Sequence, residues 1–87
     1  MIKVRSRKLI ESKWKAVGLC DYESDTVFVD LRQTDRELLD TLVHELLHYV
    51  APEFCETRVL RNATTIANQL YRHGCRVDRG KLKPHKR

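Results

Sequence analysis

The sequence predicts an α+β fold, a small β-hairpin or three-stranded sheet packed on two helices. Two patterns carry this prediction. Short runs rich in β-branched and aromatic residues occupy the first third of the chain, and apolar residues recur at three- and four-residue steps between positions 34 and 72. A chain of 87 residues forms one domain with a thin core, which a bound metal would help to stabilise. We expect one domain over residues 1–73 and a basic, flexible tail over 74–87.

Three strands are expected before the helices. Residues 2–4 alternate apolar and charged side chains, which predicts a short first strand. Trp14, Ala16 and the apolar run 17–20 predict a second strand. The acidic turn DYESD follows it, and residues 26–30 are again rich in strand-forming side chains. The second and third strands should therefore form a hairpin.

The first helix is predicted to begin at a capping box. The Thr34 hydroxyl can accept a hydrogen bond from the Glu37 backbone N–H, while the Glu37 carboxylate accepts one from the Thr34 N–H. Pro52 should end this helix, since a proline disfavours helical geometry at the residue before it. The helix would bury a broad apolar stripe made of Leu38, Leu39, Leu42, Val43, Leu46, Leu47 and Val50.

A second helix is predicted over residues 53–72, with Gly74 as its terminator. Its apolar positions recur at helical spacing and are expected to pack on the first helix: Val59, Leu60, Ala63, Ile66, Ala67 and Leu70.

Charge is segregated along the chain more strongly than the net charge of +5 suggests. Residues 1–20 carry six Lys/Arg against one Glu, residues 21–60 carry three Arg against ten Asp/Glu, and residues 61–87 carry eight Lys/Arg against one Asp. The basic ends would attract nucleic acid or an acidic partner.

The three cysteines form no Cys-x-x-Cys pair and are odd in number, which argues against a disulfide framework. We therefore expect a reducing, intracellular and cytoplasmic location. No apolar run is long enough for a signal peptide or a membrane span, so no membrane contact is expected.

The stretch HELLH, residues 44–48, is the motif that carries chemistry. Positions i and i+4 of a helix lie on one face, so His44 and His48 can direct their imidazoles at a single zinc ion. Glu45 projects about 100° away around the helix axis, where it can act as a general base without ligating the metal. Two histidines at the edge of a core are the simpler alternative. Shuffling a chain of this composition yields the motif about 0.01 times, however, which favours the zinc site.

A catalytic zinc usually has three protein ligands and one open position. The candidates for the third ligand are Glu53, Cys55 and Glu56 at the start of the second helix. Glu56 lies about 20° from the centre of that helix's apolar stripe, closer than Glu53 at about 40° or Cys55 at about 80°. We therefore predict that Glu56 is the third ligand, with Glu53 and Cys55 as alternatives.

These residues resemble the gluzincins, zinc metallopeptidases with HExxH on one helix and a glutamate ligand on the next. More specifically, the sequence resembles the minimal, zincin-like phage and bacterial members, over roughly residues 14–71. The resemblance implies peptide-bond hydrolysis by a zinc-activated water, with Glu45 as the base. It also implies that residues 26–30 form an edge strand along which a peptide substrate would lie, contacting Val27, Phe28 and Val29.

A stabiliser of the developing oxyanion is not evident from the sequence, where Tyr49, Tyr71 and His73 are the candidates. This gap leaves a second function open. The chain could instead be a zinc-stabilised interaction module with little or no catalytic activity, contacting nucleic acid or an acidic partner through its basic ends.

Overall fold

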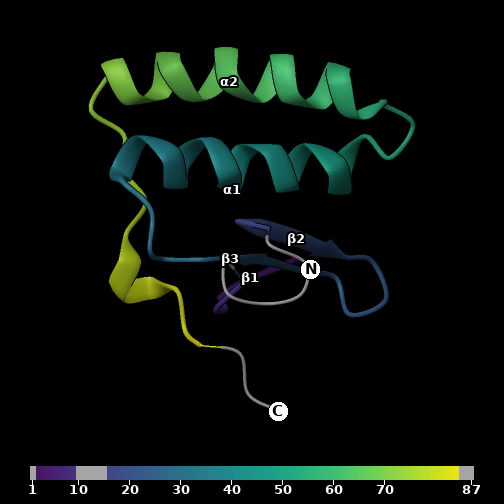
Figure 1. Cartoon of the computed structure of the whole chain (residues 1–87), viewed down its shortest axis with the longest axis horizontal. Coiled ribbons are helices and arrows are strands. Elements are labelled where there is room, and N and C mark those ends of the chain that lie inside the picture. The colour runs from purple at the N-terminus through teal and green to yellow at the C-terminus, as the bar shows by residue number, and fades with distance from the viewer. Residues whose placement is uncertain (1, 10–15, 85–87) are drawn as a thin grey trace.

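The computed structural model describes residues 2–9 and 16–84, and its architecture is the predicted α+β fold (Figure 1). The second strand was predicted to include Trp14, which lies outside the described residues. The elements in chain order are β1 (Lys3–Ser6), β2 (Gly18–Asp21), β3 (Thr26–Val29), α1 (Asp35–Val50), α2 (Glu56–Arg72) and a short 3₁₀ turn, η1 (Arg79–Lys81).

The three strands form one mixed sheet in the order β1-β3-β2. β2 and β3 make the expected hairpin, whereas β1 pairs with β3 in parallel, with Lys3 opposite Thr26 and Ser6 opposite Val29. β3 is therefore the central strand, and its side chains are buried on both faces of the sheet. Such near-continuous apolar burial is typical of a strand covered on both faces.

The prediction that residues 26–30 form an edge strand is wrong. The backbone of β3 is already paired with β1 on one side and with β2 on the other. Val27, Phe28 and Val29 are at most 3% exposed, so they cannot contact a peptide added to the sheet. The outer strands of the sheet are β1 and β2.

α1 begins where the capping box predicts. The Thr34 hydroxyl accepts from the Glu37 N–H at 3.2 Å, and the Glu37 carboxylate accepts from the Thr34 N–H at 3.0 Å. The helix ends at Val50, two residues before Pro52, as expected. Leu38 packs against Val27 and Val29 in the core, and Leu42 and Leu46 border that cluster. α1 therefore lies across the face of the sheet formed by β2 and β3.

α2 begins at Glu56, three residues later than predicted, because Pro52 is followed by a turn in which the Phe54 N–H donates to the Ala51 carbonyl. It then runs back along α1, so that α1 lies between α2 and the sheet (Figure 1). Only part of the predicted stripe is buried. Val59, Ala63 and Ala67 face α1 and are buried, whereas the remaining apolar positions, Leu60, Ile66 and Leu70, are 37–54% exposed.

The segment after α2 differs from the predicted flexible tail. Its described part, to Pro84, returns past α1 to the sheet (Figure 1). Val77 and Leu82 pack against the core, and the Arg79 guanidinium donates to the carbonyls of Leu31 and Gln33. The chain then reaches β1. Apolar side chains and a multiply bonded arginine therefore hold this segment on the domain, which a basic composition did not reveal.

None of the helices in the described ranges is long and apolar enough to cross a membrane.

Candidate metal centre

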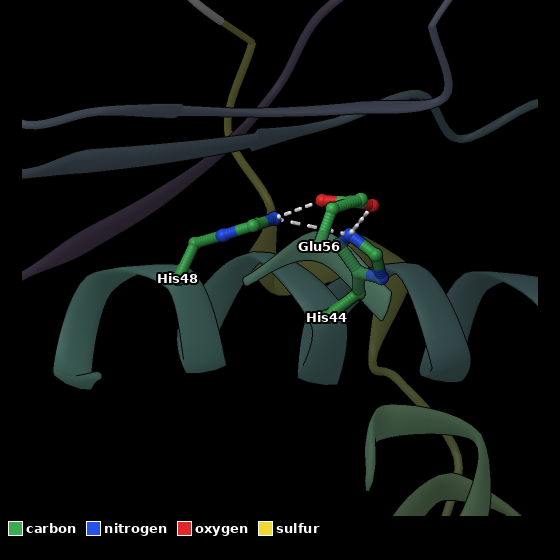
Figure 2. Close-up of side chains that lie close together, drawn as sticks. All are labelled: His44, His48 and Glu56. Atoms are coloured by element: carbon green, nitrogen blue, oxygen red, sulfur yellow. Dashed lines mark hydrogen bonds and ion pairs between the residues drawn. The ribbon is translucent and has the colours of Figure 1, made fainter. Parts of the chain in front are cut away.

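His44 and His48 lie one turn apart on α1 and approach each other through their Nε2 atoms, 3.2 Å apart (Figure 2). The two rings meet edge to face, with centroids 4.9 Å apart. Both side chains are only partly exposed. The helical spacing therefore places both histidines toward one point, as the motif predicts.

Glu56 completes this cluster from the first residue of α2. Its Oε2 lies 3.1 Å from Nε2 of His44, and its Oε1 lies 2.8 Å from Nε2 of His48 (Figure 2). The turn between the helices reverses the chain, so the start of α2 lies beside the last turns of α1. A carboxylate at a helix N-terminus is also favoured by the helix dipole.

These three side chains fit a zinc ion. Two ligand atoms at about 2.0–2.1 Å from a tetrahedral zinc are separated by about 3.3 Å. The two histidine Nε2 atoms are 3.2 Å apart, each lies 2.8–3.1 Å from one of the two Glu56 oxygens, and one ligand atom from each residue can be chosen so that all three lie within 4.8 Å of one another. Within residues 2–9 and 16–84, they form the one group of His, Cys, Asp and Glu side chains close enough to hold a metal ion. The alternatives Glu53 and Cys55 are exposed and lie outside it. Three ligands leave a tetrahedral ion one open position.

Glu45 lies outside the ligand group and points to the sheet. A Cβ built on Gly18 of β2 would come within 2.9 Å of both Cγ and Oε2 of Glu45, and within 2.7 Å of Cγ2 of Thr41. Such approaches are shorter than van der Waals contact, so Gly18 is needed for the carboxylate to sit against the backbone of β2. The sequence analysis missed Gly18 and Thr41, although a glycine inside a strand is a known sign of close approach.

Burial raises the pKa of the Glu45 carboxyl above its ordinary value, and the charge of Glu56 acts in the same direction. His44 and His48 oppose this rise. Desolvation disfavours the ionised form of an acid and so makes the carboxylate a stronger base. A raised pKa is a property expected of a group that takes and returns a proton.

A groove of about 620 Å³ opens beside this site. His44, Glu45 and Thr41 line it from α1, and residues 16–18 line it from the start of β2. The Asp30 N–H donates to the Val17 carbonyl, so alternation along the ladder turns the backbone groups of Gly18 and Cys20 away from β3. The sheet edge next to the candidate metal centre is therefore that of β2, and not the predicted residues Val27, Phe28 and Val29.

The tyrosines near the site have partners. The Tyr49 hydroxyl donates to Asp25, and its ring stacks on that of Tyr22 with centroids 6.3 Å apart. Tyr22, which the sequence analysis did not single out, donates its hydroxyl to the backbone carbonyl of His48. Tyr71 and His73 lie at the other end of α2, about 22–26 Å from Glu56 along the helix axis. These two cannot stabilise charge at the metal centre.

No protein-family model, curated protein or solved structure matches this chain. The likeness to gluzincins consequently rests on the motif and on the arrangement of His44, Glu45, His48 and Glu56.

Proposed function

We propose that the protein is a zinc-dependent metallopeptidase that hydrolyses peptide bonds. One observation carries the proposal: three ligand atoms from α1 and α2 converge, while the carboxylate of Glu45 stays outside them in the wall of a groove. A purely structural zinc has no use for such a carboxylate, and its site is usually closed by four Cys or His ligands.

His44, His48 and Glu56 would hold the ion. When bound, zinc supplies a Lewis acid that polarises the substrate carbonyl and acidifies water. Glu45 removes a proton from the attacking water while the oxygen of this water forms a bond to the carbonyl carbon of the substrate. Glu45 then returns this proton to the amide nitrogen as the C–N bond breaks, which releases the amine. Burial of Glu45 favours the first transfer, because the raised pKa of the carboxyl makes the carboxylate a stronger base.

The substrate would be an extended peptide or protein segment paired with the free edge of β2. The outward backbone groups of Gly18 and Cys20 are available for strand addition, and the groove between this edge and α1 leads to His44 and Glu45. The three cysteines are free thiols, which supports a reducing compartment such as the cytoplasm.

The test compares the wild type with Glu45→Gln, measuring zinc content and cleavage of a broad peptide mixture on the same samples. We expect one zinc in both proteins and cleavage by the wild type alone, since the amide cannot accept the proton. Glu53→Gln is the matched control, because Glu53 is an exposed carboxylate in the turn before α2 that lies outside the ligand group. It should cleave like the wild type.

A second candidate is a zinc-stabilised interaction module. It is favoured by one observation: the tyrosine hydroxyls nearest the site are already bound, Tyr22 to the His48 carbonyl and Tyr49 to Asp25. One zinc in both proteins with no cleavage by either would support this module. Equal cleavage by the wild type and Glu45→Gln would exclude the proposed mechanism.

A further inference from the structure

The two basic ends of the sequence meet beside β1. The Ser6 N–H donates to the Lys83 carbonyl at 3.0 Å, and Ser6 forms a parallel bridge with Pro84. Ser6 Oγ also donates to the Leu82 carbonyl at 3.5 Å, across 76 positions of sequence. Described positive charges from both ends, those of Lys3, Arg5, Arg7 and Lys83, therefore gather on one part of the surface.

The side chains of β1 divide between the two faces of the sheet. Lys3 and Arg5 stand opposite Thr26 and Phe28, so they share the face directed away from α1. The Arg7 guanidinium follows on the same face, 5.4 Å from the centroid of the Phe28 ring. Three cations at two-residue steps, about 6.7 Å apart along the strand, thus form a row.

This row is hollowed into a groove. A cavity of about 570 Å³ is lined by Lys3, Arg5, Arg7 and Lys83, and Asp21 is the one carboxylate among its described lining residues. A second cavity of about 590 Å³ adjoins it at Arg7 and Pro84. We call the first cavity and its four cations the cationic groove.

The cations of the groove form no ion pair with another described residue. Of the ion pairs found between described residues, none involves Lys3, Arg5 or Lys83. By contrast, Arg79 in the same C-terminal segment pairs with Asp35. Asp21 offsets one of these charges at most, and its two oxygens accept from the Glu23 N–H and the Ser24 hydroxyl rather than from a cation of the groove. The groove is thus a site of positive potential open to an anionic partner.

We propose that the cationic groove binds the sugar-phosphate backbone of a nucleic acid strand. The regular row of cations matches a polymer whose negative charges repeat along its length. A membrane surface fits less well, because none of the exposed large apolar side chains of the described residues lines this groove. Phe28 is 3% exposed and cannot stack on a base, so binding is independent of base sequence. The cations of the groove lie at the β1 edge, and the groove extends over the face of the sheet directed away from α1, opposite the face that packs on α1. It does not depend on the activity of the candidate metal centre.

Fluorescence anisotropy of a labelled single-stranded oligonucleotide of mixed sequence tests this proposal on the 87-residue chain. The variant Arg5→Gln/Lys83→Gln removes two charges of the groove, and Arg61→Gln/Arg72→Gln removes two from exposed positions of α2. Losing two phosphate contacts should weaken binding about 25-fold at about 0.1 M salt and reduce the slope of log affinity against log salt by about 1.4. The α2 variant should keep the wild-type slope.

Equal losses in the two variants would overturn the proposal, because net charge alone would then explain the binding. Poly-glutamate or phosphatidylserine vesicles that compete as well as unlabelled oligonucleotide would also overturn it, in favour of an acidic protein or a membrane. Circular dichroism checks that each variant is folded. If the half-buried Arg5 proves necessary for folding, the variant Lys3→Gln/Lys83→Gln is used in place of Arg5→Gln/Lys83→Gln, since both lysines are exposed.

Discussion

The two edges of the sheet have opposite chemistry. At the β2 edge, Gly18 makes room for the Glu45 carboxylate beside the cluster of His44, His48 and Glu56. At the β1 edge, Lys3, Arg5 and Lys83 line a groove without a paired carboxylate among the described residues. The metal side is built from neighbouring turns of two consecutive helices, whereas the cationic side needs both ends of the sequence. The spacing of residues along the sequence can therefore predict the candidate metal centre, whereas the cationic groove becomes visible only in the tertiary structure.

The largest expected effect comes from removing a ligand. His48→Ala should abolish zinc binding, and with it the stabilisation that zinc confers on the folded state. At a free zinc concentration 100 times its Kd, that stabilisation is about 2.7 kcal/mol, or about 10–20 °C in Tm for a domain of this size. Thermal unfolding with zinc and with a chelator measures it. His73→Ala, at the far end of α2, should keep the full zinc-dependent shift. If His48→Ala kept the zinc-dependent shift in Tm, the ion would have to bind elsewhere. Oligonucleotide binding should be unchanged in both His48→Ala and His73→Ala.

Gly18→Ala should separate metal binding from catalysis at the β2 edge. The added Cβ would clash with Glu45 and Thr41, and a base displaced by about 1 Å can lose about 100-fold in rate. We therefore expect kcat to fall by about 10- to 100-fold with zinc content unchanged. Adding Thr41→Ser removes the closest contact while keeping a hydroxyl for Gln33. This second change should recover stability more than kcat, and a wild-type kcat in Gly18→Ala would show that the position of Glu45 is not critical.

Arg79→Ala should loosen the C-terminal segment, and with it the β1 edge, without reaching the metal centre. The guanidinium donates to two backbone carbonyls in the segment before α1, those of Leu31 and Gln33, and pairs with Asp35 at 3.1 Å. Losing hydrogen bonds of this kind costs about 1–3 kcal/mol, which denaturant unfolding can measure. The detached segment would carry Lys83 away from β1, so oligonucleotide affinity should fall while zinc affinity stays constant.

Arg76→Ala is the matched control, because the hydrogen bonds and ring contact that Arg76 makes with described residues involve its near neighbours Tyr71 and Cys75. A loss of stability as large as that of Arg79→Ala would mean that any change in this segment has the same effect.

Much of the α-helical half could be predicted from the sequence because its signals are local. The capping box at Thr34 and the proline at position 52 predicted both ends of α1. The helical angle of Glu56 predicted that it faces the two histidines, and the structure brings the three together even though α2 begins three residues late. Strand order was not predictable in the same way. The pairing of β1 with β3 skips β2, and no periodicity within one strand specifies its neighbour.

The errors have identifiable physical causes. The continuous apolar run of β3 was compatible with a strand buried on both faces, but the family resemblance suggested an edge strand instead. The C-terminal segment was expected to be a flexible tail because it is basic, although Val77 and Leu82 provide it with apolar anchors. Composition describes the average of a segment, and two apolar side chains were enough to hold this one on the core.

The smallest expected effect concerns Cys20, which can report the charge of Glu45 without a substrate. Cys20 lies on β2 and is partly buried. Burial is the main cause that raises the pKa of its thiol, and the negative charge of Glu45 is the next. Since the thiolate is the nucleophile, iodoacetamide at pH 8 should alkylate Cys20 several-fold more slowly than the exposed Cys55 and Cys75. Glu45→Gln removes the charge but not the burial, so Cys20 should react only modestly faster, by about threefold or less. Peptide-resolved mass spectrometry follows all three sites in one sample, with Cys55 and Cys75 as internal controls. An unchanged Cys20 rate in Glu45→Gln would mean that the carboxylate does not act on β2, and a rate equal to that of Cys55 would contradict the close packing of β2 on α1.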